Sequence, residues 1–288
     1  MDEVDSPSFL PRECFEAARD GRGFAWQGPG LWVCGTIEPL SRPCVAIVGT
    51  RGATPYGKRL ARDFAAALAS AGCTIVSGLA LGIDTAAHEG TLAAQGATLG
   101  VLGSGHAQFF PRRNIELARR MAATGAVLSP YPPEHPAFPS QFLERNSVVA
   151  ALADAVVIIE APARSGALNT AGWAAERIPV FAAPGDLDRK SFAGSHALLR
   201  DGAILARDAS DVLEALQVSH DFPAAHTTRF DGLEGTLYSA LARGETSIDD
   251  LVEATGCPTA DVLAALAILE LEGAIERRSA DAFARLLH

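Results

Sequence analysis

The segment from residue 45 to residue 84 constrains the fold more than any other part of the chain. It contains two apolar runs, at 45–48 and 75–76, and each ends in a glycine-bearing polar turn that opens onto a helical run. Such strand-to-helix turns present backbone N–H groups where an anion can bind. Two of them on one parallel sheet favour a ligand with several phosphates. The turn residues are Gly49, Thr50 and Arg51 after the first run, and Ser77, Gly78 and Gly82 after the second.

The alternation of apolar strands with helical runs continues to about residue 206. Such alternation is typical of a parallel α/β sheet, in which the ligand site lies beyond the carboxyl ends of the strands, where both turns fall. Neither turn is a dinucleotide fingerprint or a P-loop, because Gly-x-Gly-x-x-Gly and Gly-Lys-Ser/Thr are absent there. We therefore predict an extended Rossmann-like α/β sheet. Its expected strands are 45–49, 73–77, 97–102, 126–129, 155–160, 180–183 and 203–206, and its expected helices are 57–71, 84–95, 113–123, 143–152 and 167–177.

The last sixty or so residues have the pattern of a second, smaller domain. Helical runs at 232–242, 247–254 and 259–272 precede a short apolar stretch, an arrangement typical of a winged helix. A recognition helix for duplex DNA needs Arg or Lys, and residues 257–272 contain neither, so we expect a module for packing or protein contact. The expected division is a short N-terminal extension at 1–39, a Rossmann-like domain at 40–216, a linker at 217–230 and a winged-helix-like domain at 231–288.

Positive charge is concentrated in the middle of the chain, although the whole sequence is acidic. The net charge is −10, yet residues 40–216 carry 16 basic and 15 acidic groups, whereas residues 229–288 carry 5 and 11. Lys58 and Lys190 are the only lysines, so nearly all the positive charge is arginine. Arginine is better suited than lysine to bidentate phosphate contact and to stacking on bases. The bulk acidity therefore does not exclude a local basic groove for nucleic acid.

Cysteine usage and hydropathy argue against several other classes of protein. The five cysteines show no Cys-x-x-Cys spacing, so neither a disulfide framework nor a zinc site is indicated, and we expect buried or partly buried thiols. No stretch approaches the roughly 18 apolar residues that a membrane span needs, and no early segment resembles a signal peptide. We expect a cytoplasmic protein with no metal, no cofactor and no membrane partner.

An aromatic and basic cluster at 142–146 points to single-stranded nucleic acid. Phe142 and Arg145 are spaced to share one face of a helix, and Asn146 follows them. A ring beside a guanidinium lets a base stack while the cation holds the backbone, a sequence-tolerant mode of binding. In the alternative interpretation, Phe142 belongs to the core and Arg145 pairs with Glu144 or Asp154.

Ionisable side chains near the turns raise the alternative of an enzyme. Asp84 and His88 lie one helical turn apart, but Asp84 opens a helix, where an acidic residue caps the helix or orders the loop. We favour that role for Asp84 and regard His88 as a structural or ligand-contacting imidazole, because no Gly-x-Ser-x-Gly elbow is present. After the fifth strand, Ser165 and Gly166 begin another helix that can receive a phosphate.

Short motifs in series carry a specific family resemblance. They are Gly49-Thr50-Arg51, Tyr56-Gly57, the run from Ser77 to Asp84, Ala87-His88, Phe142 with Arg145-Asn146, Ser165-Gly166-Ala167-Leu168, Thr170-Ala171, Pro184-Gly185 and Gly202-Ala203. With these motifs the chain resembles the DNA-processing protein A (DprA, or Smf) family of natural transformation, from roughly residue 31 to residue 216 and again over the last sixty or so residues. The segment before residue 31 is too short for the extra helical domain that members often carry. The family usually has an arginine where Ser147 stands.

The resemblance implies a non-catalytic protein that binds single-stranded DNA, protects it and loads the RecA recombinase onto it. It also implies a homodimer through the Rossmann-like domain. From their place near the far edge of the expected sheet, we add Ile204 and Leu205 as candidate contacts. A competing hypothesis is a nucleotide N-glycosidase or phosphohydrolase that uses Glu160 or Asp84, and a third is a scaffold whose DNA affinity has decayed. The implied DNA and phosphate contacts are Gly49, Thr50, Arg51, Gly57, Ser77, Gly78, Gly82, Phe142, Arg145, Asn146, Ser165 and Gly166, supported by Asp84, His88, Glu160 and Thr170.

Overall fold

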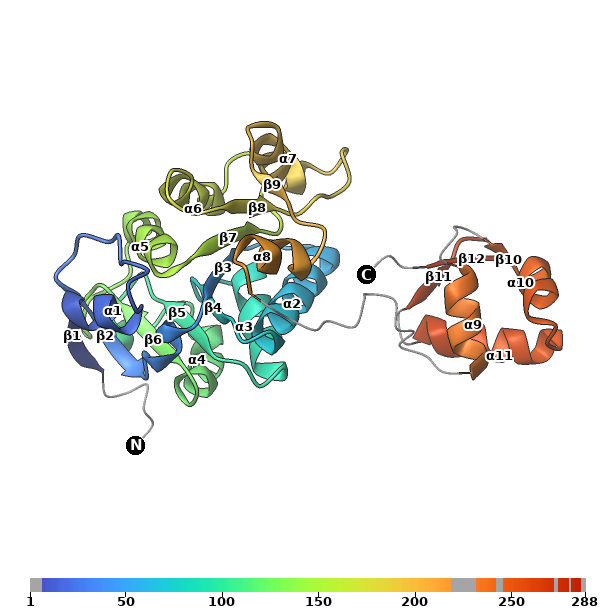
Figure 1. The fold of residues 1–288 in the computed structure, drawn as a ribbon, viewed down its shortest axis with the longest axis horizontal. Coiled ribbons are helices and arrows are strands. Elements are labelled where there is room, and N and C mark those ends of the chain that lie inside the picture. Colours follow the sequence, from blue (N-terminus) through green and yellow to red (C-terminus); the bar gives the residue numbers. More distant parts are fainter. Residues whose placement is uncertain (1–6, 219–231, 242–245, 272–273, 280, 286–288) are drawn as a thin grey trace. The chain divides into compact units, whose positions relative to one another are not determined.

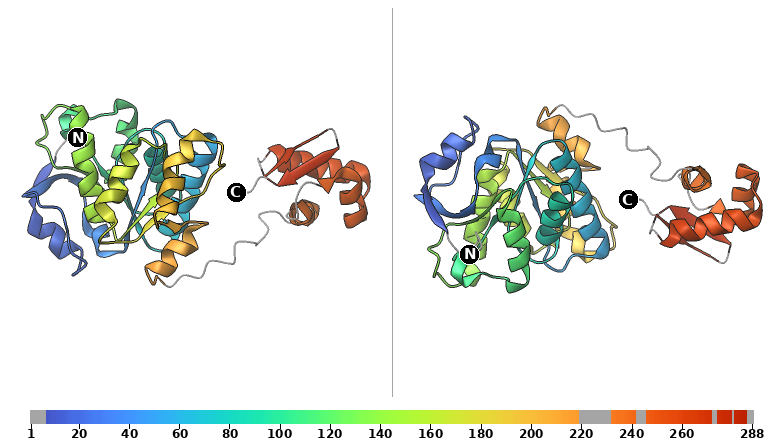
Figure 2. Two further views of the ribbon diagram at one scale, coloured as in Figure 1. Left: turned by 90° about the horizontal axis from the view of Figure 1, so that it is seen from above. Right: turned by 90° about the horizontal axis from the view of Figure 1, so that it is seen from below.

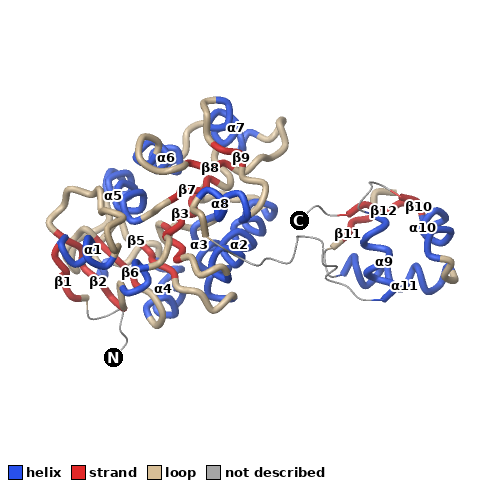
Figure 3. The backbone as a smooth tube through the Cα atoms, in the orientation of Figure 1, coloured by secondary structure: helices blue, strands red, loops and turns tan. Residues whose placement is uncertain are grey.

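The chain folds into two compact units, residues 1–220 and 221–288 (Figure 1). The computed structural model describes residues 7–218, 232–241, 246–271, 274–279 and 281–285. The linker expected at 217–230 lies almost wholly outside the described residues. Figure 3 distinguishes the helices and strands of the two units by colour.

The first unit is built on a nine-stranded sheet with the order β1-β2-β6-β5-β4-β3-β7-β8-β9. The strands from β3 to β9 are parallel, whereas β2 pairs antiparallel with both β1 and β6. The predicted Rossmann-like parallel sheet is confirmed, and residues 8–35 add β1 and β2 to it instead of forming a separate extension. The strands are β1 (Ser8–Pro11), β2 (Gly30–Gly35), β3 (Cys44–Val48), β4 (Thr74–Ser77), β5 (Thr98–Val101), β6 (Ala126–Ser129), β7 (Ala155–Ile158), β8 (Val180–Ala182) and β9 (Ile204–Leu205).

Helices cover both faces of this sheet, as the two views in Figure 2 show. Helices α1, α5, α6 and α7 pack on one face, and α2, α3 and α4 pack on the other. Because both faces are covered, the central strands are continuous apolar runs, and all five residues of β3 are buried. The helices are α1 (Arg12–Ala18), α2 (Pro55–Ser70), α3 (Ile83–Ala93), α4 (Ile115–Ala122), α5 (Pro139–Leu152), α6 (Gly166–Ala174), α7 (Ala193–Arg200) and α8 (Ala209–Ala215).

Sequence-encoded caps begin two helices at the carboxyl ends of central strands. Thr54 is the N-cap of α2, and its hydroxyl accepts a hydrogen bond from the Gly57 N–H at 3.0 Å. Ser165 plays the same part for α6, accepting from the Ala167 N–H at 3.2 Å. The order of strands reverses beside β3, since the chain proceeds from β3 to β6 on one side and resumes at β7 on the other. Both helix starts therefore lie where an open α/β sheet forms its ligand crevice.

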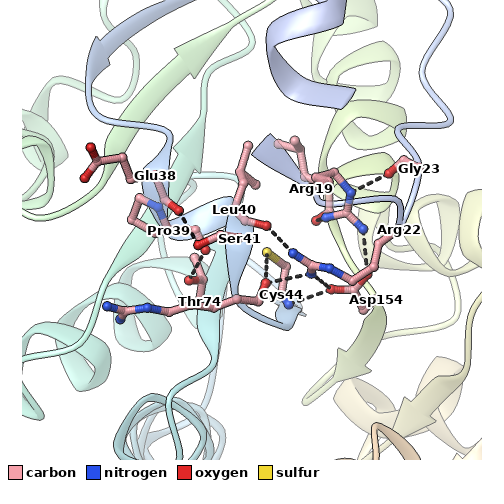
Figure 4. A network of polar contacts seen from close by, with 12 residues as sticks. Arg19, Arg22, Gly23, Glu38, Pro39, Leu40, Ser41, Cys44, Thr74 and Asp154 are labelled. Atoms are coloured by element: carbon pink, nitrogen blue, oxygen red, sulfur yellow. Dashed lines mark hydrogen bonds and ion pairs between the residues drawn. The ribbon is translucent and has the colours of Figure 1, made fainter. Parts of the chain in front are cut away.

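A buried polar network holds the N-terminal segment against the amino ends of the same strands (Figure 4). Arg19 is 1% exposed, and its guanidinium lies 2.6 Å from a carboxylate oxygen of Asp154 and donates to the carbonyls of Gly23 and Leu152. The other carboxylate oxygen of Asp154 pairs with Arg22 at 2.5 Å and accepts from the backbone N–H at the start of β3. One carboxylate thus joins two arginines to the start of the sheet.

The second unit is a winged helix, as the sequence predicts. Three helices pack around a small apolar core beside a three-stranded sheet in the order β10-β12-β11. Ser247 caps α10 by accepting from the Asp250 N–H at 3.1 Å. The elements are α9 (Gly232–Ala240), β10 (Thr246–Ser247), α10 (Ile248–Thr255), α11 (Thr259–Leu271), β11 (Ile275–Arg277) and β12 (Ala282–Arg285).

The described residues also bear on cysteine pairing, membrane-spanning helices and metal sites. The cysteines are free, three of them buried and two partly buried. No single helix in the described ranges has both the length and the hydropathy to cross a membrane, although α10 and α11 reach them when taken together across a 112° bend. Across the same ranges, His, Cys, Asp and Glu side chains form no group of three or more that could hold a metal ion.

Candidate nucleic-acid interface

A cleft of about 670 Å³ lies at the carboxyl ends of β3, β4 and β7. It is lined by the turns after these strands and by the first turns of α5 and α6. Eleven of the predicted residues line it, namely Gly49, Thr50, Arg51, Gly78, Asp84, Phe142, Arg145, Asn146, Ser165, Gly166 and Thr170. Five of them lie outside the lining, namely Gly57, Ser77, Gly82, His88 and Glu160. The sequence thus located the cleft but not the part that each residue plays in it.

Arg51 is an exposed cation of the cleft, and its side chain lies over an aromatic ring. Its guanidinium carbon lies 5.0 Å from the ring centroid of Phe142, a cation–π geometry, and the Phe110 ring lies 5.7 Å from that of Phe142. The backbone of the turn is fixed, because the Thr50 N–H donates to the Glu160 carbonyl at 2.7 Å. The sequence assigned Arg145 as the partner of the Phe142 ring, whereas the structure gives that place to Arg51, nearly a hundred residues earlier.

Arg145 is buried beneath the cleft instead of facing outward from it. It is 3% exposed, and its guanidinium donates to the carbonyls of Gly78 and Val101, while its Nε donates to the Asn146 side chain at 3.3 Å. Burial lowers the pKa of Arg145 to about 10, although the Asp84 carboxylate acts in the opposite direction. The expectation of an outward-facing Arg145 is therefore corrected, because its Nη1 and Nε donate inside the protein and the residue lines only the floor of the cleft. Neither Glu144 nor Asp154 is its partner, so the alternative pairing is corrected as well.

Asp84 orders the second turn, which is the role favoured from the sequence. Its Oδ2 accepts from the N–H groups of Gly78 at 3.1 Å and Ala80 at 3.3 Å. Burial raises the pKa of Asp84, with Arg145 acting in the opposite direction. Because a carboxylate of the protein already takes these N–H groups, the second turn does not offer them to a phosphate. The expectation of a second anion cradle at Gly78 is therefore corrected.

Two further members of the expected second cradle also have internal partners. The Ser77 hydroxyl is buried and donates to the Ile47 carbonyl at 2.6 Å. Gly82 has φ of 86°, and a Cβ there would overlap the Thr50 carbonyl oxygen. Gly82 therefore lets the start of α3 approach the turn that carries Arg51. Both residues shape the cleft from behind and do not line it.

Glu160 and Gly57 meet behind the first turn. Glu160 is fully buried, and its Oε2 accepts from the N–H of Thr54 at 3.0 Å and from its hydroxyl at 2.9 Å. A Cβ at Gly57 would overlap this same carboxylate oxygen. Glu160 thus anchors the loop between β3 and α2, and Gly57 makes room for it. Neither residue reaches the cleft, which corrects the expectation that Gly57 contacts a phosphate.

His88 is a structural histidine. It is fully buried, and its Nδ1 lies 2.7 Å from the Thr98 hydroxyl in β5. Burial lowers the pKa of His88 to about 3, so the imidazole is neutral at neutral pH. Of the two roles that the sequence left open, the structure supports the structural one.

The start of α6 forms one wall of the cleft. Asn146 of α5 donates to the Gly166 carbonyl at 3.0 Å, which ties the two helices together. Thr170 is buried one turn further along α6. Arg164, which immediately precedes the Ser165 cap, is exposed and lines the cleft. The lining therefore contains two exposed arginines, Arg51 and Arg164, against a single buried carboxylate.

Sequence reasoning also missed an apolar rim. Phe110, Pro139 and Leu143 line the cleft, and Phe110 and Leu143 are 48% and 50% exposed. Paired phenylalanines such as Phe109 and Phe110 usually pack in a core, and only Phe109 does so here. The available signal was the proline-rich run before α5, which holds apolar side chains near the surface.

A cationic, partly aromatic cleft at the reversal point of a parallel sheet, followed by a winged helix, defines a class of phosphate- and nucleic-acid-binding proteins. The model of the family described as DNA recombination-mediator protein A matches residues 24–217, and that of the DprA winged helix domain matches residues 219–281. The chain belongs to the DNA recombination-mediator protein A family. The family resemblance seen in the sequence is thereby confirmed.

Two relatives from bacteria match most of the chain. A protein of Mycobacterium tuberculosis described as DNA processing protein DprA is 40% identical over 258 residues, covering 86% of this chain and 66% of that protein. Protein Smf of Escherichia coli is 36% identical over 257 residues, covering 85% of this chain and 69% of that protein. The chain thus spans about two thirds of the length of these relatives.

Two solved structures match the fold at more than 30% identity. DprA of Streptococcus pneumoniae has a TM-score of 0.68 and 32% identity, covering 74% of this chain and 75% of that chain. DprA of Helicobacter pylori has a TM-score of 0.64 and 31% identity, covering 75% of this chain and 98% of that chain. The H. pylori protein is described as having a unique mode of binding single-stranded DNA.

Proposed function

We propose that this chain binds single-stranded DNA in the cleft without regard to sequence and without chemical conversion. The observation that carries the proposal is the Arg51 guanidinium held 5.0 Å from the Phe142 ring at the open face of the cleft. A guanidinium and an aromatic ring held together bind two parts of one nucleotide. The guanidinium pairs with the phosphate, and the ring stacks on the base. The single-stranded DNA binding named for the H. pylori relative supports the same ligand.

The hydrogen bonds that Glu160 and Asp84 accept inside the protein support a binding protein over an enzyme. A nucleotide N-glycosidase or phosphohydrolase would need a carboxylate that can reach substrate. Glu160 is fully buried and holds Thr54 through Oε2, and Asp84, which lines the cleft, is only 4% exposed and holds the N–H groups of Gly78 and Ala80 through Oδ2. Release of free base from nucleoside monophosphates by the purified chain would contradict a non-catalytic role.

The substitution Arg51→Ala tests the site directly. It removes the exposed cation without leaving a buried group unpaired, so we expect at least a tenfold loss of affinity for an oligothymidylate and no change in melting temperature. The salt dependence should become shallower by about 0.7 in the slope of log K against log salt, the loss of one phosphate contact on a single strand. Fluorescence anisotropy over a salt series measures both quantities.

Arg120→Ala is the matched control for this variant. Arg120 is exposed in the last turn of α4 and does not line the cleft, so its removal changes total charge equally. Equal affinities of the parent, Arg51→Ala and Arg120→Ala chains would refute the site. A matching duplex, which should bind more weakly than the single strand, tests the preference for unpaired bases.

The biological role that we propose is to protect incoming single strands and to load the RecA recombinase onto them during natural transformation, in the cytoplasm. The family to which the chain belongs is described as a recombination mediator, which supports this role. RecA filament growth on single-stranded DNA mixed with the Arg51→Ala chain should match growth on DNA without it. If this variant stimulated filament growth as strongly as the parent, RecA loading would not depend on DNA binding in the cleft.

We further propose that the chain is a homodimer joined through the edge of its Rossmann-like domain. Ile204 and Leu205 in the edge strand β9 are 45% and 46% exposed. An exposed apolar edge strand is a surface that natural proteins usually cover. Light scattering should give a dimer mass for the parent and a monomer mass for Leu205→Arg, and equal masses would exclude this interface.

A further inference from the structure

A second group of stacked rings lies beside the cleft, in the segment that leads into α5. The rings of Tyr131 and His135 stack with centroids 4.9 Å apart and planes 13° apart. The ring of Phe138 meets His135 edge-on at 6.1 Å. Phe138 is 50% exposed, so half of this large apolar side chain faces solvent.

This segment is fixed although it belongs to no helix or strand. The Tyr131 hydroxyl donates to a carboxylate oxygen of Glu144 at 2.9 Å, and the Phe138 N–H donates to the Gln141 side chain at 3.0 Å. The His135 carbonyl accepts from the Gly105 N–H at 2.8 Å. Five prolines between residues 130 and 139 restrict the backbone further. A surface held in this way binds a ligand with little loss of conformational entropy.

The ring group continues the surface of the cleft. Phe138 directly precedes Pro139, which lines the cleft, and Leu143 in the next turn of α5 is half exposed and also lines it. Apolar residues thus occupy four of the six positions from Phe138 to Leu143, at the start of α5. Single exposed apolar residues are normal on a protein, whereas contiguous ones that meet a binding cleft mark a contact surface.

The charges of the segment select the part of a nucleotide that would lie there. Arg145 is the only arginine or lysine between residues 121 and 163, and it is 3% exposed, with its Nη1 donating to two carbonyls inside the protein. Glu134 is exposed on the segment, and Glu144 holds Tyr131. These carboxylates repel phosphate, whereas an aromatic ring accepts the face of any base.

We propose that Phe138, supported by His135 and Tyr131, is a stacking subsite for a base of single-stranded DNA outside the cleft. The subsite rests on the proposed function, because it extends the path of a strand already held at Arg51 and Phe142. It lengthens the bound segment without adding a phosphate contact. A strand too short to reach beyond the cleft does not use it.

Oligothymidylates of two lengths, about 4 and about 15 nucleotides, test the subsite, since single-strand sites span roughly 4–16 nucleotides. Phe138→Ala should weaken the long oligomer about fivefold or more, because stacking of one base contributes ~1–3 kcal/mol. Its affinity for the short oligomer and its salt slope should equal those of the parent. Phe138→Trp should bind the long oligomer as tightly as the parent does, whereas Phe138→Leu should bind it as weakly as Phe138→Ala does.

Phe9→Ala is the matched control. Phe9 is 44% exposed and meets the Trp32 ring edge-on at 5.6 Å, but it lies on the edge strand β1 and does not line the cleft. Equal long-oligomer affinities of Phe138→Ala and Phe9→Ala would overturn the subsite while leaving the cleft intact. A parent chain that binds neither length would overturn the proposed function, and the subsite with it, so the two failures are distinguishable.

Discussion

The two ends of strands β3, β4 and β7 use similar chemistry for different purposes. At the amino ends, the buried Arg19 pairs with Asp154 and donates to two carbonyls, and the N-terminal segment covers the network (Figure 4). At the carboxyl ends, the buried Arg145 also donates to two carbonyls, and it flanks Gly78 together with Asp84. The second end opens into the cleft of about 670 Å³, and the first end carries a hollow of about 420 Å³ that is lined in part by Arg19 and Arg22. Both ends thus have a buried arginine beneath a hollow, and they differ in the side chains that line it, because at the second end an exposed arginine lies over a phenylalanine ring.

The largest effect that separates the two ends is expected from Asp154→Ala. Removing this carboxylate leaves Arg19 buried without its counter-charge, which lowers the free energy of unfolding by about 3–5 kcal/mol. Urea unfolding measures the loss. Affinity of the folded fraction for oligothymidylate should not change, because the network lies at the far ends of the strands. A weaker affinity in the folded variant would show that the two ends are coupled.

A smaller loss of stability, joined to a loss of binding, is expected from Arg145→Met. The carbonyls of Gly78 and Val101 lose their donor, and unfolding should become easier by about 1–3 kcal/mol. DNA affinity should fall as well, because the second turn and Asn146 lose the side chain that positions them. Unfolding and anisotropy on one preparation give both values. Unchanged affinity would mean that Arg145 supports the fold alone.

Much of the fold could be predicted from the sequence, because a sheet covered on both faces needs continuous apolar strands. All seven strands predicted from residue 45 onward lie within two residues of their expected ends. The segment before residue 40 was harder, since β1 and β2 run antiparallel at the sheet edge and do not follow the strand–helix alternation. Short helices such as α7 and α8 also went unpredicted, because each spans only about two turns.

The site was predictable in position but less so in detail. Gly-Thr-Arg at the end of β3 located Arg51, since such a turn must lie at the open end of the sheet. Helical spacing placed Arg145 beside Phe142 but did not reveal which of them faces solvent, because that depends on how α5 packs against β4 and β5. The role expected for Asp84 and the second anion site expected at Gly78 exclude each other. A carboxylate that orders a turn accepts from the same N–H groups that a phosphate would need.

The turn that carries Arg51 is enclosed from behind on two sides. Thr50 donates to the Glu160 carbonyl, its own carbonyl accepts from the Ile83 N–H, and Gly82 leaves no room for a side chain against it. An insertion at Thr50 would break both bonds at once, whereas Gly52, which has open space around it, takes part in neither. Ligand preference of the cleft can therefore change in evolution by substitution of its surface side chains. An insertion at Thr50 would instead disrupt the backbone that positions Arg51.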